Sequence, residues 1–230
     1  DPFQPAFAFA QGLLICVSKA TSKQASTSRF DLIGALTTTM ASSSLGTVLL
    51  FDLDGTLYLE SNGYVQHCRN RGAAFLSEKF GWSLEEAEEK RKLALKTSNQ
   101  TVKGLKTLGY DVNVVDFVTY MREGVEKFLK PDEDLSSFLA AVKHKKYIFT
   151  NTREVEAEKA LKCLGIREHF EHVYGADFMG DMCKPEEAAF QKVIDDIGVS
   201  ATNCVMFEDS IKNVVAAKSM GMKTIFVRGR

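Results

Sequence analysis

Residues 47–56 have the sequence Thr-Val-Leu-Leu-Phe-Asp-Leu-Asp-Gly-Thr. Up to Phe51 the stretch is uncharged and almost entirely apolar, which is typical of a short strand buried on both faces of a parallel sheet. Two acidic residues, Asp52 and Asp54, follow directly, and Gly55 indicates a turn. The stretch therefore predicts a central strand that brings two carboxylates to its carboxyl end.

Four more apolar runs of similar length follow, at residues 146–150, 172–174, 203–207 and 223–227. Amphipathic patterns separate them, and Gly165, Gly198 and Gly221 are placed to end the corresponding helices. Strands that alternate with helices predict an α/β fold. We expect a doubly wound, Rossmann-like parallel sheet of five core strands with helices on both faces.

The stretch from residue 58 to residue 145 breaks this alternation. It contains no convincing strand, and its apolar spacing predicts helices over residues 65–80, 83–98 and 114–128. Ser83 and Glu86 match a capping box at the start of the second of these helices. We therefore expect a helical cap inserted after the first strand, at 58–145, on an α/β core formed by 47–57 and 146–230.

Composition excludes several classes of protein. The 230 residues carry 29 Lys and Arg against 30 Asp and Glu, so the formal net charge of −1 gives no reason to expect a nucleic acid polymer or an anionic membrane surface as partner. No apolar run is long enough to span a bilayer. The five cysteines include no Cys-x-x-Cys pair and suit a reducing compartment. We expect a cytoplasmic protein, monomeric or homodimeric.

Residues 1–46 differ from the rest because they are rich in Ser and Thr and poor in acidic residues. This composition is typical of an organelle transit peptide and also of a disordered tail. Met40, followed by Ala-Ser-Ser-Ser, would make a plausible translation start. We expect a disordered or targeting extension, with a plastid or mitochondrial location if it is a transit peptide.

Residues able to do chemistry follow the predicted strands. They are Asp52, Asp54 and Thr56 after the first strand, Thr150 and Asn151 after the second, Lys184 beyond the third, and Glu208, Asp209 and Asn213 after the fourth. Ligands of an open parallel sheet bind beyond the carboxyl ends of its strands, so these residues are expected to meet at one edge.

The residue types indicate the chemistry. Carboxylates packed together repel one another unless a cation lies between them, and a set of oxygen ligands without His or Cys favours Mg²⁺. A lysine with hydroxyl and backbone donors beside such an ion favours a phosphoryl group as ligand. One carboxylate could act as nucleophile and a second as acid and base. No Walker or Gly-x-Gly-x-x-Gly loop is present.

These motifs, in this order, resemble those of the haloacid dehalogenase-like hydrolase superfamily. The resemblance runs from about residue 48 to residue 227 and carries the motifs Asp-x-Asp-x-Thr at 52–56, Thr150, Lys184 and Glu208-Asp209. Residues 51–58, 104–110 and 148–151 look more narrowly like its pyrimidine 5′-nucleotidase subgroup.

The resemblance implies a role for each matching residue. Asp52 would be the nucleophile and a Mg²⁺ ligand, and Asp54 the general acid and base, with its backbone carbonyl on the metal. Thr150 and the backbone of Asn151 would hold phosphate oxygens, and Lys184 would neutralise charge. Asp209 and Glu208 would be metal ligands. Thr56 would orient Asp54 or its loop, and Asn213 would position Lys184.

The resemblance also implies the activity. We expect a Mg²⁺-dependent phosphomonoesterase that forms an aspartyl-phosphate and acts on a small phosphorylated metabolite. The favoured substrate is a pyrimidine nucleoside 5′-monophosphate. Residues 99–106 of the cap would recognise the leaving group, although residues 97–102 (Thr-Ser-Asn-Gln-Thr-Val) depart from the subgroup's pattern. Alternatives are a phosphatase for a sugar phosphate, phosphoglycolate or a cofactor precursor, and a non-catalytic relative. Dehalogenation is disfavoured because it needs no second aspartate.

Overall fold

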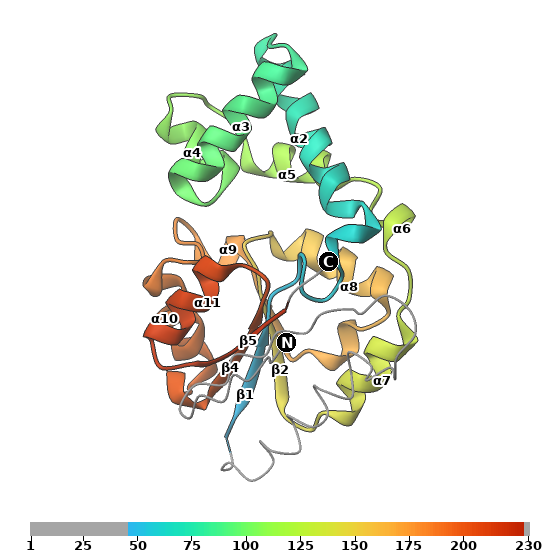
Figure 1. Cartoon of the computed structure of the whole chain (residues 1–230), viewed down its shortest axis with the longest axis vertical. Coiled ribbons are helices and arrows are strands. Elements are labelled where there is room, and N and C mark those ends of the chain that lie inside the picture. Colours follow the sequence, from blue (N-terminus) through green and yellow to red (C-terminus); the bar gives the residue numbers. More distant parts are fainter. Residues whose placement is uncertain (1–45, 228–230) are drawn as a thin grey trace, which may run out of the picture.

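The computed structural model describes residues 46–227, so nearly all of the predicted extension at 1–46 lies outside the described residues. The described chain forms two bodies, one around a sheet and one made of helices above it (Figure 1). Among the helices of residues 46–227, none combines the length and the apolar character that crossing a bilayer requires.

The sheet has five parallel strands in the order β3-β2-β1-β4-β5, which confirms the predicted α/β fold. The strands are β1 (Val48–Phe51), β2 (Lys145–Phe149), β3 (His172–Tyr174), β4 (Cys204–Glu208) and β5 (Lys223–Phe226). β1 is central and pairs Phe51 with Ile148 of β2 on one side and with Phe207 of β4 on the other. Every residue of β1 is buried, because helices cover both faces of the sheet.

Each face of the sheet has its own apolar core. Leu49 and Phe51 point to one face, where they pack in a cluster with Leu161 of α8 (Glu154–Leu164). Val48 and Leu50 point to the other face and pack with residues of α10 (Glu187–Ile197) and α11 (Ile211–Ser219). The alternation along β1 therefore places helices on both sides, as Figure 1 shows.

The upper body contains α2 (Tyr64–Phe80), α3 (Leu84–Ser98), α4 (Thr101–Thr107) and α5 (Val114–Arg122). It has a separate apolar core that includes Leu76, Leu105 and Phe117. Ser83 caps α3 by accepting a hydrogen bond from the backbone N of Glu86 at 3.1 Å, as the capping-box pattern predicts.

The chain between the two bodies differs from the prediction. The helix expected over 114–128 is broken into α5 and α6 (Val125–Phe128), because Gly124 adopts the left-handed conformation with φ 85°. α7 (Glu133–Ala141), which lies inside the stretch 58–145 assigned to the cap, packs with the sheet: its Leu135 and Leu139 belong to the same cluster as Leu49. On this packing we propose that the cap ends near Gly124.

The helix after Lys184, α10, begins at Glu187. Pro185 precedes it, and Glu186 is the residue before its first turn. The remaining elements are short: η1 (Glu60–Asn62), η2 (Arg167–His169), α9 (Ala176–Met179) and η3 (Ala201–Asn203).

One contact in the cap gives a test of the fold. A Cβ added to Gly104 of α4 would lie 1.9 Å from the backbone O of Ala94 in α3, so the two helices touch through their backbones. At an open helical site Gly→Ala stabilises by roughly 0.5–1 kcal/mol. Here we expect Gly104→Ala to destabilise the cap by about 1–3 kcal/mol, since the backbones must separate.

Urea unfolding followed by the fluorescence of Trp82, the single tryptophan and a residue of the cap, measures this change. Thr107→Ala on the same helix is the control, because Thr107 is exposed. A more stable Gly104→Ala protein would contradict the described contact.

Candidate active site

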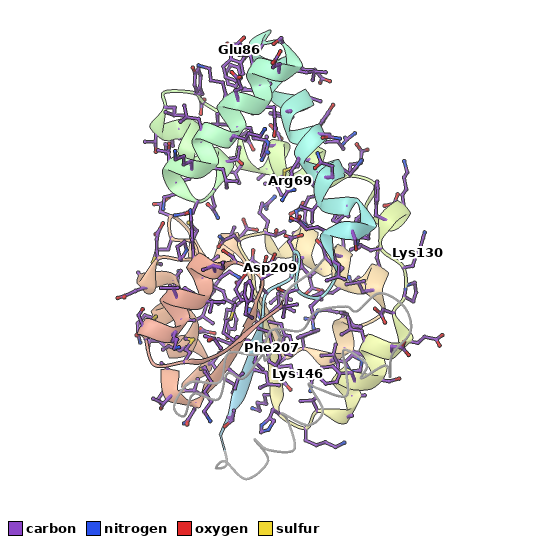
Figure 2. All side chains as sticks on the ribbon, in the orientation of Figure 1. Arg69, Glu86, Lys130, Lys146, Phe207 and Asp209 are labelled. Atoms are coloured by element: carbon purple, nitrogen blue, oxygen red, sulfur yellow. The ribbon has the colours of Figure 1, made fainter. Side chains whose placement is uncertain are left out.

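The functional side chains lie where β1 and β4 end next to each other. The backbone N of Asp52 donates to the carbonyl of Phe207 at 2.9 Å, which extends the pairing of the two strands by one residue. Asp52 therefore emerges beside Glu208, the last residue of β4. Figure 2 shows Asp209 at the end of the sheet that faces the cap, with Phe207 deeper in the sheet.

Three carboxylates gather at this edge, as predicted. One oxygen each of Asp52, Glu208 and Asp209 lies within 4.8 Å of the others. Glu208 and Asp52 are buried, and Asp209 is half-buried. The loop above them is tight: Gly55 has φ 86°, and a Cβ there would lie 2.1 Å from Oδ2 of Asp209. Only glycine fits this position.

Lys184 enters the cluster from the side and is almost completely buried. Its ammonium donates to Oδ1 of Asp52 at 2.7 Å, to Oε2 of Glu208 at 2.8 Å and to the carbonyl of Phe149 at 2.6 Å. An ammonium has three protons, so these acceptors use its full donor capacity. Burial alone would lower the pKa of Lys184, but the two carboxylates raise it above its ordinary value, so the side chain stays charged.

Asn151 holds Lys184 in place through its side-chain amide. Its Nδ2 donates to the carbonyl of Lys184 at 2.9 Å, and its Oδ1 accepts from the backbone N of Lys184 at 2.8 Å. This positioning role was expected of Asn213. Asn213 is buried, but within residues 46–227 no hydrogen bond joins it to Lys184, whose ammonium already has three acceptors.

The acidic cluster has more negative charge than Lys184 can balance. Burial, followed by the charge of Glu208, raises the pKa of Asp52 well above its ordinary value despite Lys184. Burial and Glu208 also raise the pKa of Asp209, to about 7. Three oxygen donors with surplus negative charge fit a hard divalent cation. Asp52, Glu208 and Asp209 would hold it.

Asp54 has a separate set of partners. Its Oδ2 accepts from Nη2 of Arg122 and, at 2.9 Å, from Oγ1 of Thr152, while its Oδ1 accepts from the Tyr58 hydroxyl. Burial alone would raise the pKa of Asp54, but the charge of Arg122 and these hydrogen bonds hold it below its ordinary value. In this arrangement Asp54 is an ionised carboxylate held between the cap and the core.

Thr150 and Thr56 are both buried beside these groups. Oγ1 of Thr150 accepts from the backbone N of Thr152 at 3.1 Å, and so shapes the loop after β2. The backbone N of Thr56 donates to the carbonyl of Leu53 at 3.3 Å, across the turn that contains Asp54.

The partners of Asp54 were not predicted from the sequence. Tyr58 and Thr152 lie next to motifs that were recognised, so their positions gave a local signal. Arg122 is 68 residues from Asp54, at the end of a cap helix, and gave none. Only the fold brings it to the site.

Two cavities flank α5. The first, here called the cap cleft, has a volume of about 640 Å³ and lies between α4 and α5 of the cap and, on the core, the loop at 151–153 and the start and end of α9. The second, here called the hinge cavity, has a volume of about 770 Å³ and is lined by residues of α2, of α5 to α6 and of α8, including Tyr64, Arg122 and Glu156. Asn151 and Thr152 line the cap cleft, and they contact Lys184 and Asp54 respectively.

Comparisons with known families and with solved structures both find haloacid dehalogenase-like proteins. Residues 47–221 match the family described as haloacid dehalogenase-like hydrolase. The HAD phosphatase of Thermococcus onnurineus is a similar solved structure, with a TM-score of 0.56, 25% sequence identity, and coverage of 79% of this chain and 86% of that one.

The names of two curated relatives refer to phosphate metabolism or to a phosphatase. "Phosphate metabolism protein 8" of Saccharomyces cerevisiae is 28% identical over 193 residues, which cover 76% of this chain and 59% of the yeast protein. A phosphoglycolate phosphatase of Neisseria gonorrhoeae is 27% identical over 121 residues, which cover 51% of each chain. The chain thus spans little more than half the length of these relatives.

The acidic cluster predicts a stabilising effect of Mg²⁺ that does not depend on catalysis. A cation at ten times its dissociation constant stabilises by about 1.4 kcal/mol. For a protein of this size we expect the melting temperature to rise by roughly 2–6 °C. Asp209→Asn should remove most of this rise and should itself stabilise the metal-free protein, because it relieves repulsion with Glu208.

Thermal unfolding with Mg²⁺ and with chelator measures both effects. Asp195→Asn, at an exposed position of α10, is the matched control and should keep the full rise. Equal Mg²⁺ stabilisation of the Asp209→Asn and Asp195→Asn proteins would show that the cation binds elsewhere.

Proposed function

This chain belongs to the haloacid dehalogenase-like hydrolase family, and we propose that it is a Mg²⁺-dependent phosphomonoesterase that acts on a small phosphorylated metabolite. The observation that supports this most directly is the position of Lys184, whose ammonium lies 2.7 Å from Asp52 inside the acidic cluster. A nucleophilic carboxylate, a fixed cation and a divalent metal site at one point suit an anionic ester.

Asp52 is the proposed nucleophile. One of its oxygens forms a bond to phosphorus while the bond from phosphorus to the ester oxygen breaks, and the electron pair stays on the leaving oxygen. Lys184 orients Asp52 and neutralises negative charge on the transferred group. When bound, Mg²⁺ supplies further positive charge and lowers the repulsion between the carboxylates and the ester.

Asp54 is the proposed acid and base. In its protonated form it donates its proton to the leaving oxygen. As a carboxylate it then takes a proton from the water whose oxygen attacks phosphorus and breaks the bond to Asp52. The result is inorganic phosphate and free Asp52. Asp54 must leave its present partners for these steps, since both of its oxygens are hydrogen-bonded here.

The cap cleft supports a nucleoside-sized leaving group. Its volume of about 640 Å³ lies within the range of small-molecule sites. Val114, Phe117 and Val118 give it an apolar wall, while Asn99 and Gln100 supply amide groups. Residues 99–103 and 106 line the cleft, which supports a role for this segment in recognition of the leaving group.

We therefore propose a pyrimidine nucleoside 5′-monophosphate as substrate. A base offers a flat apolar face for the wall and polar edges for the amides. Phosphoglycolate would leave the apolar wall unused, and a sugar phosphate or cofactor precursor remains the alternative of similar size. A non-catalytic relative is disfavoured because both Asp52 and Lys184 are in place.

Replacement of the nucleophile tests the chemistry. We expect Asp52→Asn to lower kcat for an aryl phosphate by roughly 10³-fold or more, because the amide cannot form the aspartyl-phosphate. Chelation of Mg²⁺ should abolish turnover as well. Asp195→Asn is the control for protein quality. Hydrolysis by Asp52→Asn at the wild-type rate would refute the assignment.

A panel of phosphate esters tests the substrate. For the nucleoside monophosphates of uracil and cytosine we expect kcat/KM to exceed that for phosphoglycolate by about 10²-fold, since burial of the base contributes a few kcal/mol. Purine nucleotides and fructose 1-phosphate complete the panel. A preference for a sugar phosphate over all nucleotides would leave the chemistry intact but overturn the proposed substrate.

A further inference from the structure

Arg122 contacts the proposed acid and base but uses only part of its donor capacity. It lies at the end of α5, and its side chain is 9% exposed. Nη2 donates to Asp54. The Nε and Nη1 atoms are buried and, among the residues that the structure describes, have no hydrogen-bond partner. A guanidinium has five N–H donors in a fixed plane, so this side chain can bind a second acceptor.

A second carboxylate nearby is buried and has one oxygen without a hydrogen-bond partner among residues 46–227. Glu156 of α8 is 4% exposed. Its Oε1 accepts from Oγ1 of Thr119 at 3.3 Å, and its Oε2 is buried with no partner within residues 46–227. Arg153 interacts with Glu156 electrostatically but forms its ion pair with Asp177, and a buried carboxylate oxygen without a hydrogen-bond partner is costly.

The two incomplete side chains line the same space. Arg122 and Glu156 both border the hinge cavity of about 770 Å³, together with Thr119. Thr119 is one helical turn before Arg122 on α5, so their Cβ atoms are about 5–6 Å apart. The carboxylate that Thr119 contacts is therefore within reach of a long side chain such as Arg122.

Arg122 and these two carboxylates belong to different parts of the chain. Asp54 is a half-buried carboxylate that Arg122 contacts, and Glu156 is a buried carboxylate that lines the same cavity as Arg122 and Lys159. Arg122 belongs to the cap helix α5, whereas Glu156 belongs to α8 of the core. A movement of the cap over the core would therefore change the distance between Arg122 and Glu156.

We propose that Arg122 is a positioning residue shared by Asp54 and Glu156: it holds Asp54 as seen here and transfers to Glu156 when Asp54 turns to the substrate. The inference rests on the proposed phosphatase activity and extends it to the control of Asp54. Glu156 then compensates the charge of Arg122 while Asp54 is engaged in catalysis, and the hinge cavity gives the guanidinium room to move.

A double-mutant cycle tests the transfer. Without Glu156 as second partner, Arg122 stays on Asp54, so Glu156→Gln should lower kcat about tenfold with KM changed less than about twofold. In an Arg122→Met background the same change should alter kcat by less than about twofold, because Glu156 acts only through Arg122.

The control is Glu158→Gln. Glu158 lies on the same helix but pairs with Arg167 at 2.7 Å and does not border the hinge cavity, so its replacement should leave kcat unchanged. A normal kcat for Glu156→Gln, or an equal loss in both backgrounds, would overturn the proposal. A wild-type protein without turnover on any ester would instead refute the phosphatase function.

A crystal structure of the wild-type chain with Mg²⁺ and orthovanadate gives a readout that does not depend on the folding of any variant. We expect a nitrogen of Arg122 within about 3.2 Å of the Glu156 carboxylate and no hydrogen bond from Arg122 to Asp54. With vanadate bound at Asp52, an Arg122 still paired with Asp54 would overturn the transfer.

Discussion

The buried ammonium of Lys184 is the contact on which the site depends. It lies between Asp52 and Glu208, whose carboxylates would otherwise repel each other. It therefore lets both carboxylates occupy the same interior edge of the sheet. The pairing of β1 with β4 brings these carboxylates together, and the amide of Asn151 fixes the backbone of Lys184 opposite them. Loss of any one of these three elements would leave an uncompensated buried charge.

The site has two electrostatic halves with different functions. Around Asp52, carboxylates exceed cations, and this half is suited to bind positive charge and an ester. Around Asp54, Arg122 and two hydroxyls stabilise one carboxylate within the protein. The first half is built within the core, on the ends of β1 and β4 and on Lys184 of the segment before α10, whereas the second includes Arg122 of the cap. Binding chemistry is therefore fixed by the rigid sheet, and the state of Asp54 is sensitive to the cap.

The sequence was informative where physical signals are local. Buried parallel strands are short apolar runs, so all five were predicted, and the acids at the ends of β1 and β4 followed from them. Signals that depend on distant packing were missed. The break at Gly124 interrupts an apolar pattern that continues across it. The residues of α7 fall inside the stretch that was assigned to the cap, although their leucines pack with the sheet. Nothing near Arg122 in the sequence indicates Asp54 as its partner.

The two hydrogen bonds between Asn151 and Lys184 make the site sensitive to deamidation of Asn151. Its amide matches the main chain of Lys184 because Nδ2 faces a carbonyl and Oδ1 faces an N–H. Deamidation to aspartate keeps the shape of the side chain but turns the donor into an acceptor, so two oxygens would face each other. An aspartate at this position would therefore lose the hydrogen bond to the carbonyl of Lys184 and hold that backbone less firmly.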